Sequence, residues 1–196
     1  MARRSELSRK TPATDISVSL SLDGTGKTEI ATGVGFFDHM LTAFGRHGLF
    51  DLDIRAVGDL HIDAHHTVED VGIVLGQAFN VALEDKRGIQ RFGQAAVPMD
   101  EALVEAAVDL SGRPFLAWSV AFERATLGSV DTQLFEEFFR ALTGNGLFTL
   151  HVRQLAGVNA HHVAEAAFKA SARALRAAVA LEPRIAGQVP STKGVI

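Results

Sequence analysis

The sequence contains no cysteine among its 196 residues. This absence excludes both a disulfide framework and a metal site built from thiolates. No apolar run approaches the roughly 18 residues that a membrane-spanning helix requires. The first ten residues are polar and basic, without the apolar stretch of a secretory signal. We therefore expect a cytoplasmic protein.

An excess of positive charge is also lacking. The 19 lysines and arginines are outnumbered by 23 aspartates and glutamates, which gives a formal net charge of -4 at pH 7. Without a basic field, binding to nucleic acid or to an anionic membrane is not expected. Hydrophobic residues make up 47% of the chain, which suits one globular unit or two small, closely packed halves.

The sequence does contain a repeated histidine motif. His65-His66-Thr67-Val68-Glu69 recurs near the other end of the chain as His161-His162-Val163-Ala164-Glu165. On a helix, a His and a Glu four residues apart lie on one face, about 5–6 Å apart at their Cβ atoms. Imidazole and carboxylate together suit a divalent metal such as Zn, Mn, Fe or Ni. The repeat therefore predicts a duplicated chain with two related metal positions.

The two histidines of each motif are expected to have different partners. Adjacent helical residues point about 100° apart, so they bind different metals, or a metal and a substrate. The motif also differs from His-Glu-x-x-His, in which the Glu between the histidines is the base of a zinc protease. Here the Glu follows both histidines and is interpreted as a ligand, and Mn with open positions for substrate fits such a shell.

The hydrophobic patterns repeat in the same order in the two halves. Gly48–Leu52 aligns with Gly146–Leu150, and each segment precedes its double-histidine motif by a similar interval. Alternation predicts strands over 16–22, 27–32 (returning as a hairpin partner), 50–56, 60–64, 104–110, 115–122 and 148–152. Helical spacing predicts helices over 37–44, 65–84, 134–142 and 159–182, the last one capped by Asn159.

These elements predict an α+β fold. Each half is a duplicated βα unit, and two four-stranded sheets, each covered by two helices, pack into one core. The first half-repeat is residues 1–93, with the first motif. The second is residues 94–196, with the second motif and a tail that is expected to bind phosphate.

Further histidines extend the candidate ligand set. His151 lies on the polar face of its predicted strand, and His39 follows Phe36-Phe37-Asp38. With both motifs they give six histidines and two glutamates, enough for two sites of three imidazoles and one carboxylate. Spacing alone does not distinguish His39 from an ordinary histidine on a helix surface. His61 is interpreted as an exposed strand residue.

A second set of candidates is cationic. Arginine forks, lysine ammonium groups and a serine hydroxyl are the groups that bind a phosphate, and they occur here as Arg91, Arg113, Lys169, Ser191 and Lys193. Taken singly, each charge is more readily explained as a solvated surface residue. Gly24-Thr25-Gly26-Lys27 lacks the full spacing of a P-loop.

Taken together, these motifs resemble those of the imidazoleglycerol-phosphate dehydratase family of histidine biosynthesis. The matching blocks run in order from about residue 9 to the C-terminus: Phe37–Leu41, the first His-His-x-x-Glu-Asp, Lys86–Ile89, Arg91–Gly93, Pro98–Glu101, Asp109–Pro114, the second His-His-x-x-Glu, and Pro190–Gly194. The resemblance implies a duplicated α/β chain that binds two Mn²⁺ per subunit. It also implies a homo-oligomer of 24 subunits with sites formed between them.

The resemblance also implies roles for individual residues. The metal ligands would be His39, His65, His66, Glu69, His151, His161, His162 and Glu165. The substrate phosphate would be bound by Arg91, Arg113, Lys169, Ser191 and Lys193, with His47 in the substrate pocket. The implied reaction removes water from imidazole glycerol phosphate to give imidazole acetol phosphate. Metal at both ring nitrogens would favour the imidazolate, which expels the neighbouring hydroxyl while a base takes the carbon-bound proton.

One position departs from the family pattern. The family's N-terminal block resembles Arg-x-Thr-x-Glu-Thr, in which the Glu is a catalytic acid–base, whereas this chain has Ala13 at that position. Alanine cannot transfer a proton, and Asp15 is shorter and displaced. Ala13 reflects either a deliberate Glu→Ala change that traps substrate, which we favour, or a natural enzyme that is impaired or differently arranged.

Three functions are compatible with the sequence. The leading hypothesis is a Mn-dependent hydro-lyase, whose activity in this exact chain is in doubt because of Ala13. The alternative is a catalytically silent assembly that binds metal and an imidazole phosphate. A metallohydrolase would rest on the His/Glu sites alone, and the sequence offers no nucleophile motif for it.

Overall fold

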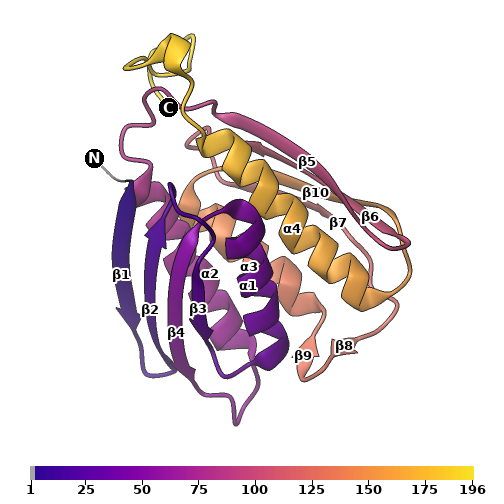
Figure 1. Cartoon of the computed structure of the whole chain (residues 1–196). Coiled ribbons are helices and arrows are strands. Elements are labelled where there is room, and N and C mark those ends of the chain that lie inside the picture. The colour runs from indigo at the N-terminus through magenta and orange to yellow at the C-terminus, as the bar shows by residue number, and fades with distance from the viewer. Residues whose placement is uncertain (1–2) are drawn as a thin grey trace.

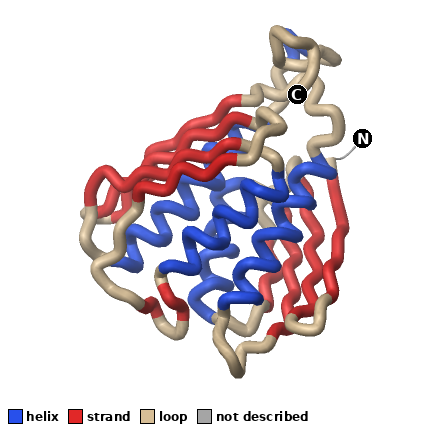
Figure 2. The backbone as a smooth tube through the Cα atoms, turned by 180° about the vertical axis from the view of Figure 1, so that it is seen from behind, coloured by secondary structure: helices blue, strands red, loops and turns tan. Residues whose placement is uncertain are grey.

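The computed structural model describes residues 3–196 and has two sheets on the outside with four helices between them (Figures 1 and 2). The first half contains β1 (Arg4–Lys10), β2 (Thr14–Ser21), β3 (Thr28–Ala31), α1 (Gly35–Gly48), β4 (Asp51–Gly58) and α2 (His65–Ala82). The second half contains β5 (Phe92–Met99), β6 (Ala102–Asp109), β7 (Phe115–Ser119), β8 (Thr126–Leu127), β9 (Val130–Asp131), α3 (Gln133–Gly146), β10 (Thr149–Ala156) and α4 (Ala160–Val179). A short 3-10 helix, Pro183–Ile185, follows.

The two sheets have the same topology. The first sheet has the order β1-β2-β4-β3 and the second has the order β5-β6-β10-β7. In each, three strands are antiparallel and the fourth pairs in parallel with its neighbour, β3 with β4 and β7 with β10. The predicted α+β fold with two four-stranded sheets, each covered by two helices, is confirmed. The division between residues 93 and 94 stays a prediction; β5 begins at Phe92.

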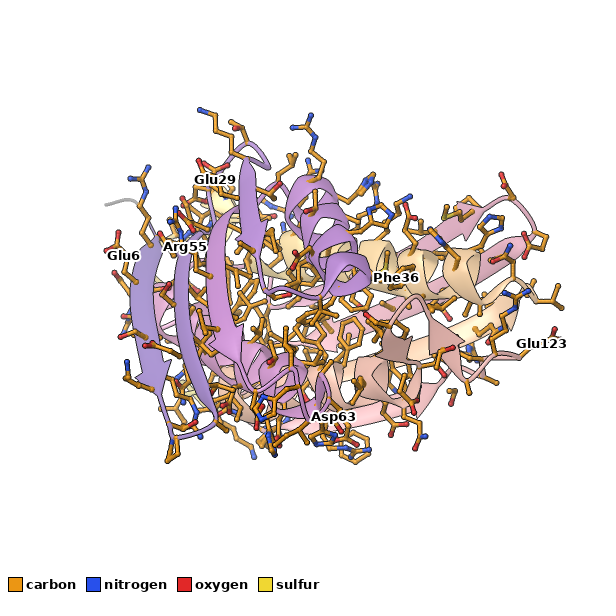
Figure 3. The ribbon with its side chains drawn as sticks, turned by 90° about the horizontal axis from the view of Figure 1, so that it is seen from below. Glu6, Glu29, Phe36, Arg55, Asp63 and Glu123 are labelled. Carbon is orange, nitrogen blue, oxygen red and sulfur yellow. The ribbon has the colours of Figure 1, made fainter. Side chains whose placement is uncertain are left out.

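Alternation along the strands separates a buried face from an open one. Ile16, Val18 and Leu20 of β2 are almost fully buried against the helices. Glu6, Glu29 and Arg55 lie on the opposite face of the first sheet, which no helix covers (Figure 3). Burial of one face is what fixes the register of such a sheet, because a slip by one residue would turn every apolar side chain outward.

The helix pairs pack on each other in the middle of the molecule. Phe138 of α3 stacks on Phe168 of α4 with ring centroids 5.3 Å apart and meets Phe37 of α1 edge-on at 5.3 Å. Helices α2 and α3 approach closely because α2 carries glycine at their contact. A Cβ on Gly76 would come within 2.5 Å of the Leu142 carbonyl oxygen. Aromatic packing and this close contact join the two halves into one core.

Two strand predictions were wrong. The segment over 27–32 does not return as a hairpin beside β2, because β3 pairs with the far side of β4. The Asp51 carboxylate accepts hydrogen bonds from the Thr25 and Lys27 N–H groups, at 2.8 and 2.9 Å. These bonds hold the loop between β2 and β3 against the start of β4. Residues 60–64 form a turn, because the Ile62 N–H donates to the Asp59 carbonyl.

Element ends also differ from the prediction. Helix α4 is capped as expected, since the Asn159 side chain accepts from the N–H groups of His161 and His162. It ends at Val179 rather than at 182, because Leu181 forms a bridge with Ile89. Strand β7 stops at Ser119. The edge strands β1 and β5 were not predicted, since their sequences lack clear apolar alternation. No helix within residues 3–196 meets the length and apolarity that a membrane span needs.

Candidate functional site

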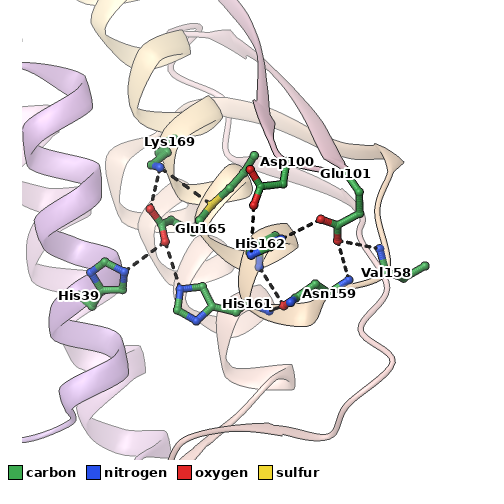
Figure 4. Close-up of polar contacts among 10 residues, drawn as sticks. His39, Asp100, Glu101, Val158, Asn159, His161, His162, Glu165 and Lys169 are labelled. Carbon is green, nitrogen blue, oxygen red and sulfur yellow. Dashed lines mark hydrogen bonds and ion pairs between the residues drawn. The ribbon is translucent and has the colours of Figure 1, made fainter.

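The second histidine motif meets a histidine from the other half of the chain. His39 of α1 and His161 of α4 both approach the same oxygen of Glu165, with Nε2–Oε2 distances of 3.1 and 3.2 Å (Figure 4). The ligand atoms of these three side chains lie within 4.8 Å of one another. Within residues 3–196, no other three His, Cys, Asp or Glu side chains bring their ligand atoms this close together. Two imidazoles and a carboxylate are a suitable donor set for a divalent metal.

Glu165 is held as a carboxylate despite its burial. It is only 7% exposed, and its Oε1 accepts a 2.6 Å ion pair from Lys169 Nζ, one helical turn along α4. Burial alone would raise the pKa of Glu165, but the hydrogen bond and charge of Lys169, together with His39, lower it below its ordinary value. An ionised carboxylate beside two imidazoles fits a cation.

His162 points away from this cluster, as its position next to His161 predicts. Its Nδ1 lies 2.7 Å from Glu101 Oε2, and its Nε2 lies 3.8 Å from Asp100 Oδ2 (Figure 4). The other Glu101 oxygen accepts from the Asn159 N–H at 2.9 Å. The pKa of Glu101 is lowered to about 2, chiefly by the His162 hydrogen bond, while Glu101 raises the pKa of His162. Glu101 therefore fixes the imidazole and the residue that caps α4.

We expect the substitution Glu101→Gln to lower the pKa of His162 in the metal-free protein. Because this pKa is raised on folding, the stability from protonated His162 is complete below its unfolded value of 6.5 and is lost as the pH rises through the folded value. The pKa is measured by NMR titration of the imidazole C–H signals. Asp100→Asn is the matched control and should have the smaller effect, since its carboxylate lies farther away. An unchanged His162 titration in Glu101→Gln would contradict the assignment.

The first motif has a similar but more open arrangement. His65 Nε2 lies 4.0 Å from Glu69 Oε2, and His66 Nδ1 lies 2.9 Å from Asp59 Oδ2. The pKa of His66 is raised, mainly by this hydrogen bond. In both halves, then, the second histidine of the motif is held through Nδ1 by a carboxylate, as metal-binding histidines commonly are.

These orienting carboxylates were missed as site residues. Asp59 lies in the turn that follows β4, and Glu101 lies in the motif Pro98–Glu101. Their acidic character was visible in the sequence. Asp59 lies only seven residues before His66, in the turn that leads into α2. Glu101 lies 61 residues before His162, so only the folded chain shows that it reaches this imidazole.

The remaining histidines have different surroundings. His151 is exposed on the outer face of the second sheet, beside Phe115 with ring centroids 6.1 Å apart, so this chain does not bring it to the His39 cluster. His61 is exposed in the turn before α2, not in a strand. Burial lowers the pKa of His47, and the charges of Lys169 and Arg173 lower it further. His47 is therefore neutral near pH 7.

Four of the five predicted phosphate ligands lie together. They line a pocket of about 300 Å³ beside the C-terminal tail, made by Arg91, Ser111, Arg113, Ser191, Thr192, Lys193, Val195 and Ile196. Arg91 is fixed by a two-pronged pair with Asp109, at 2.7 and 3.3 Å, and donates to the Pro190 carbonyl at 2.9 Å. Cations and a hydroxyl converging on one pocket suit an anion such as phosphate.

The pocket and the histidine cluster are far apart within one chain. The Arg91 N–H bonds the Ala178 carbonyl near the end of α4, whereas Glu165 lies near its start. The rise of 1.5 Å per residue separates them by about 20 Å. Lys169 lies with the cluster and not with the four other predicted phosphate ligands. A single small ligand is therefore too short to reach both places in one chain.

Ala13 lies at the tip of the β1–β2 hairpin, close to the first motif. Its carbonyl accepts the Asp59 N–H at 3.1 Å, and Asp59 in turn holds His66. Asp15 forms an exposed 2.6 Å ion pair with Lys10. Asp59 therefore connects the backbone at position 13 to His66, a predicted metal ligand.

Comparison with known proteins identifies the family. A family model described as imidazoleglycerol-phosphate dehydratase matches residues 32–175. The chain belongs to the imidazoleglycerol-phosphate dehydratase family. The dehydratase of Acidiphilium cryptum is 68% identical over 196 residues, which is 100% of each chain. That of Gluconacetobacter diazotrophicus is 65% identical over 195 residues, covering 100% of this chain and 98% of its own.

Solved structures of this family share the fold. Imidazoleglycerol-phosphate dehydratase from Staphylococcus aureus is 40% identical, with a TM-score of 0.83, and the match covers 91% of this chain and 99% of that one. The enzyme from Pyrococcus furiosus, in complex with (S)-C348, is 40% identical with a TM-score of 0.84, over 97% and 100% of the two chains. The resemblance stated from the motifs is therefore confirmed.

Proposed function

We propose that the chain catalyses the dehydration of imidazole glycerol phosphate to imidazole acetol phosphate in histidine biosynthesis, as a carbon–oxygen hydro-lyase. The observation that carries the proposal is the convergence of His39 and His161 on the ionised Glu165. That cluster joins the two halves of the chain, and family membership supplies the reaction. A cytoplasmic location remains part of the proposal.

The proposal includes two Mn²⁺ per subunit. One would be held by the His39, His161 and Glu165 cluster. The others of the predicted ligands, His65, His66, Glu69, His151 and His162, would complete the two sites. When bound, Mn²⁺ supplies Lewis-acid stabilisation of negative charge on the imidazole ring. Zinc or iron would suit the same donor set, so metal analysis decides between them.

Complete sites are proposed to form between subunits of a homo-oligomer, with 24 subunits in the assembly. Two features support this. His151 lies on the outward face of the second sheet, and about 20 Å separates the Glu165 cluster from the pocket of Arg91 along α4. One small substrate meets both groups only if they come from different copies of the chain.

The chain's own residues would bind and orient the substrate. Arg91 and Arg113 would hold the phosphate, with Asp109 keeping both guanidinium groups in place. Fixing the far end of the substrate reduces the entropy cost of placing the reacting carbon. His47, neutral near pH 7, would hydrogen-bond the substrate in its pocket. The reaction also needs a group that takes the carbon-bound proton, and Ala13 does not supply one.

The proposed function is tested by turnover, metal content and size. The purified chain with Mn²⁺ should convert imidazole glycerol phosphate to imidazole acetol phosphate, at a rate reduced by Ala13. Elemental analysis should find two metal ions per chain, and removal of metal with a chelator should lower the mass seen in light scattering. Hydrolysis of a phosphate ester, or metal binding with no dehydration even when Glu occupies position 13, would contradict the proposal.

We expect Arg91→Ala to raise the KM for imidazole glycerol phosphate by about 10–100-fold, because charge-assisted hydrogen bonds to an anion contribute about 1.5–3 kcal/mol. Steady-state kinetics and competition by inorganic phosphate measure the effect. Arg176→Ala is the matched control, since Arg176 is exposed on α4 and does not line the pocket. Equal phosphate affinity in the two variants would show that the pocket is not the phosphate site.

A further inference from the structure

The two halves can be compared residue by residue at their hairpin tips. In the first sheet the Thr11 N–H bonds the Thr14 carbonyl, which leaves Pro12 and Ala13 at the β1–β2 tip. In the second sheet Met99 pairs with Ala102, which leaves Asp100 and Glu101 at the β5–β6 tip. Ala13 is therefore the counterpart of Glu101. Both tips lie against the start of the helix that carries a double-histidine motif.

The first tip is tied to its helix by a buried carboxylate. Asp70 of α2 is 7% exposed. Its Oδ1 accepts the Arg9 Nε–H at 3.1 Å, and its Oδ2 accepts a short hydrogen bond from the Thr14 hydroxyl. Asp70 lies four residues after His66, so both side chains project from the same face of α2 toward the hairpin.

Thr11 extends this contact into the tip itself. Its hydroxyl lies 3.1 Å from that of Thr14 and accepts the N–H groups of Ala13 and Thr14 at 3.2 and 3.0 Å. The Ala13 carbonyl then accepts the Asp59 N–H. The backbone of residue 13 is thus held on one side through Asp70 and on the other through Asp59, the residue that orients His66.

The second half has none of these polar groups at the equivalent positions. By strand pairing, the counterparts of Arg9 and Thr14 are Val97 and Ala102, and the counterpart of Asp70 on α4 is Ala166. Ala102 and Ala166 are fully buried apolar residues. The second tip is therefore held without a buried carboxylate; its polar contacts to the start of α4 come from the tip residue Glu101 itself.

Burying the Asp70 carboxylate costs desolvation, and an ion pair with a buried carboxylate is often no more stabilising than apolar residues at the same positions. The first half has this buried carboxylate, whereas the second half has alanine at the equivalent helix position. The buried carboxylate occurs in the half whose hairpin tip contains position 13, where the resemblance to the family places an acid–base residue. A network that fixes backbone position is useful where a side chain must be aimed precisely.

We infer that Asp70, acting through Arg9 and Thr14, is a positioning residue that fixes the β1–β2 tip so that the side chain at position 13 faces the first histidine motif. The inference rests on the proposed function, because residue 13 is taken to act on the substrate. Asp70 does not itself touch the substrate. Its effect on turnover therefore depends on which side chain occupies position 13.

The test is a double-mutant cycle between Asp70→Asn and Ala13→Glu, in the full-length, Mn²⁺-loaded protein. Asp70→Asn keeps an acceptor for Thr14 and removes the charge facing Arg9. With Glu at position 13, it should lower kcat at least about tenfold more than it does with Ala13, and change KM little. Lys10→Gln is the control, because it removes an exposed ion pair from the same hairpin. An equal loss of kcat with Glu and with Ala at position 13 overturns the inference.

Amide hydrogen exchange gives a readout that does not depend on activity. Asp70→Asn should accelerate exchange of the N–H groups of residues 13 and 14 by about tenfold or more, and Lys10→Gln should not. Unchanged exchange overturns the inference. If Ala13→Glu shows no dehydration at all, the proposed function fails, and exchange alone then decides whether Asp70 holds the tip. Should Asp70→Asn not fold, Thr14→Val replaces it, with Thr14→Ser expected to restore both readouts.

Discussion

Replacing Ala13 with glutamate is expected to raise kcat for imidazole glycerol phosphate by about 10²–10⁴-fold, the usual contribution of a general acid–base. The methyl group of alanine holds no transferable proton. The tip is tied through the Ala13 carbonyl to Asp59, and Asp59 holds His66.

Steady-state kinetics with the parent chain and with Ala13→Glu measure this effect. Ala13→Gln is the matched control, because it has nearly the same shape but cannot exchange a proton; its kcat should stay close to that of the parent. KM should change much less than kcat if residue 13 acts in the transition state. Equal activity of the Glu and Gln variants would exclude proton transfer at this position.

The second large effect is expected for Glu165→Ala. Loss of this carboxylate removes one ligand from the His39 and His161 cluster and leaves the Lys169 ammonium without its 2.6 Å partner. We expect the affinity of the His39 cluster for Mn²⁺ to fall by more than about 100-fold, since even residues behind metal ligands contribute about 10–100-fold. We also expect the free energy of unfolding of the metal-free chain to fall by about 3 kcal/mol.

Metal titration and urea unfolding with a chelator measure the two losses separately. Glu69→Ala is the matched control: it removes the corresponding glutamate of the first motif, whose side chain is 44% exposed and 4.0 Å from His65. It should weaken metal binding but change the unfolding free energy by less than about 1 kcal/mol. Equal destabilisation by both variants would contradict the buried Lys169 pair.

The pH dependence of the stability loss gives an additional check. The pKa of Glu165 is lowered on folding, so its stabilisation is fully present above its unfolded value of 4.5 and is lost as the pH falls through the folded value. The difference in unfolding free energy between the parent and Glu165→Ala should therefore be largest near neutral pH and shrink toward acidic pH.

Much of the fold could be predicted because most of its strands and helices follow from the spacing of apolar residues along short segments. Alternation identified β2, β4, β6 and β10, and helical spacing identified all four helices. Strands β1 and β5 were missed because edge strands with polar or small side chains lack that signal. The parallel pairing of β3 was missed for a different reason: strand partners are chosen by the path of the intervening chain, here by the turn that Asp51 caps.

Contacts in the candidate site were also predictable only where they are local in sequence. The His161–Glu165 contact follows from helical spacing, and the structure places those atoms 3.2 Å apart. The contact between His39 and Glu165 joins residues 126 positions apart, so no local pattern contains it, and the family resemblance supplied His39 instead. The roles of Glu101 and Asp70 likewise depend on contacts between elements distant in sequence, whereas Asp59 meets His66 across only seven residues.

The sequence by itself determined the duplication, the two histidine motifs, the family and the unusual Ala13, because all of these are properties of residue order. The tertiary structure decided at which positions the two halves have equivalent contacts and at which positions their contacts differ. Packing of α1 on α4 brings His39 to the second motif, and the outward face of the second sheet keeps His151 away from it. A buried carboxylate on the helix holds the first hairpin tip, whereas the second has buried alanines at the equivalent positions and is tied to its helix by Glu101. Such differences arise only where separate elements meet, since burial and hydrogen-bond partners belong to the folded chain.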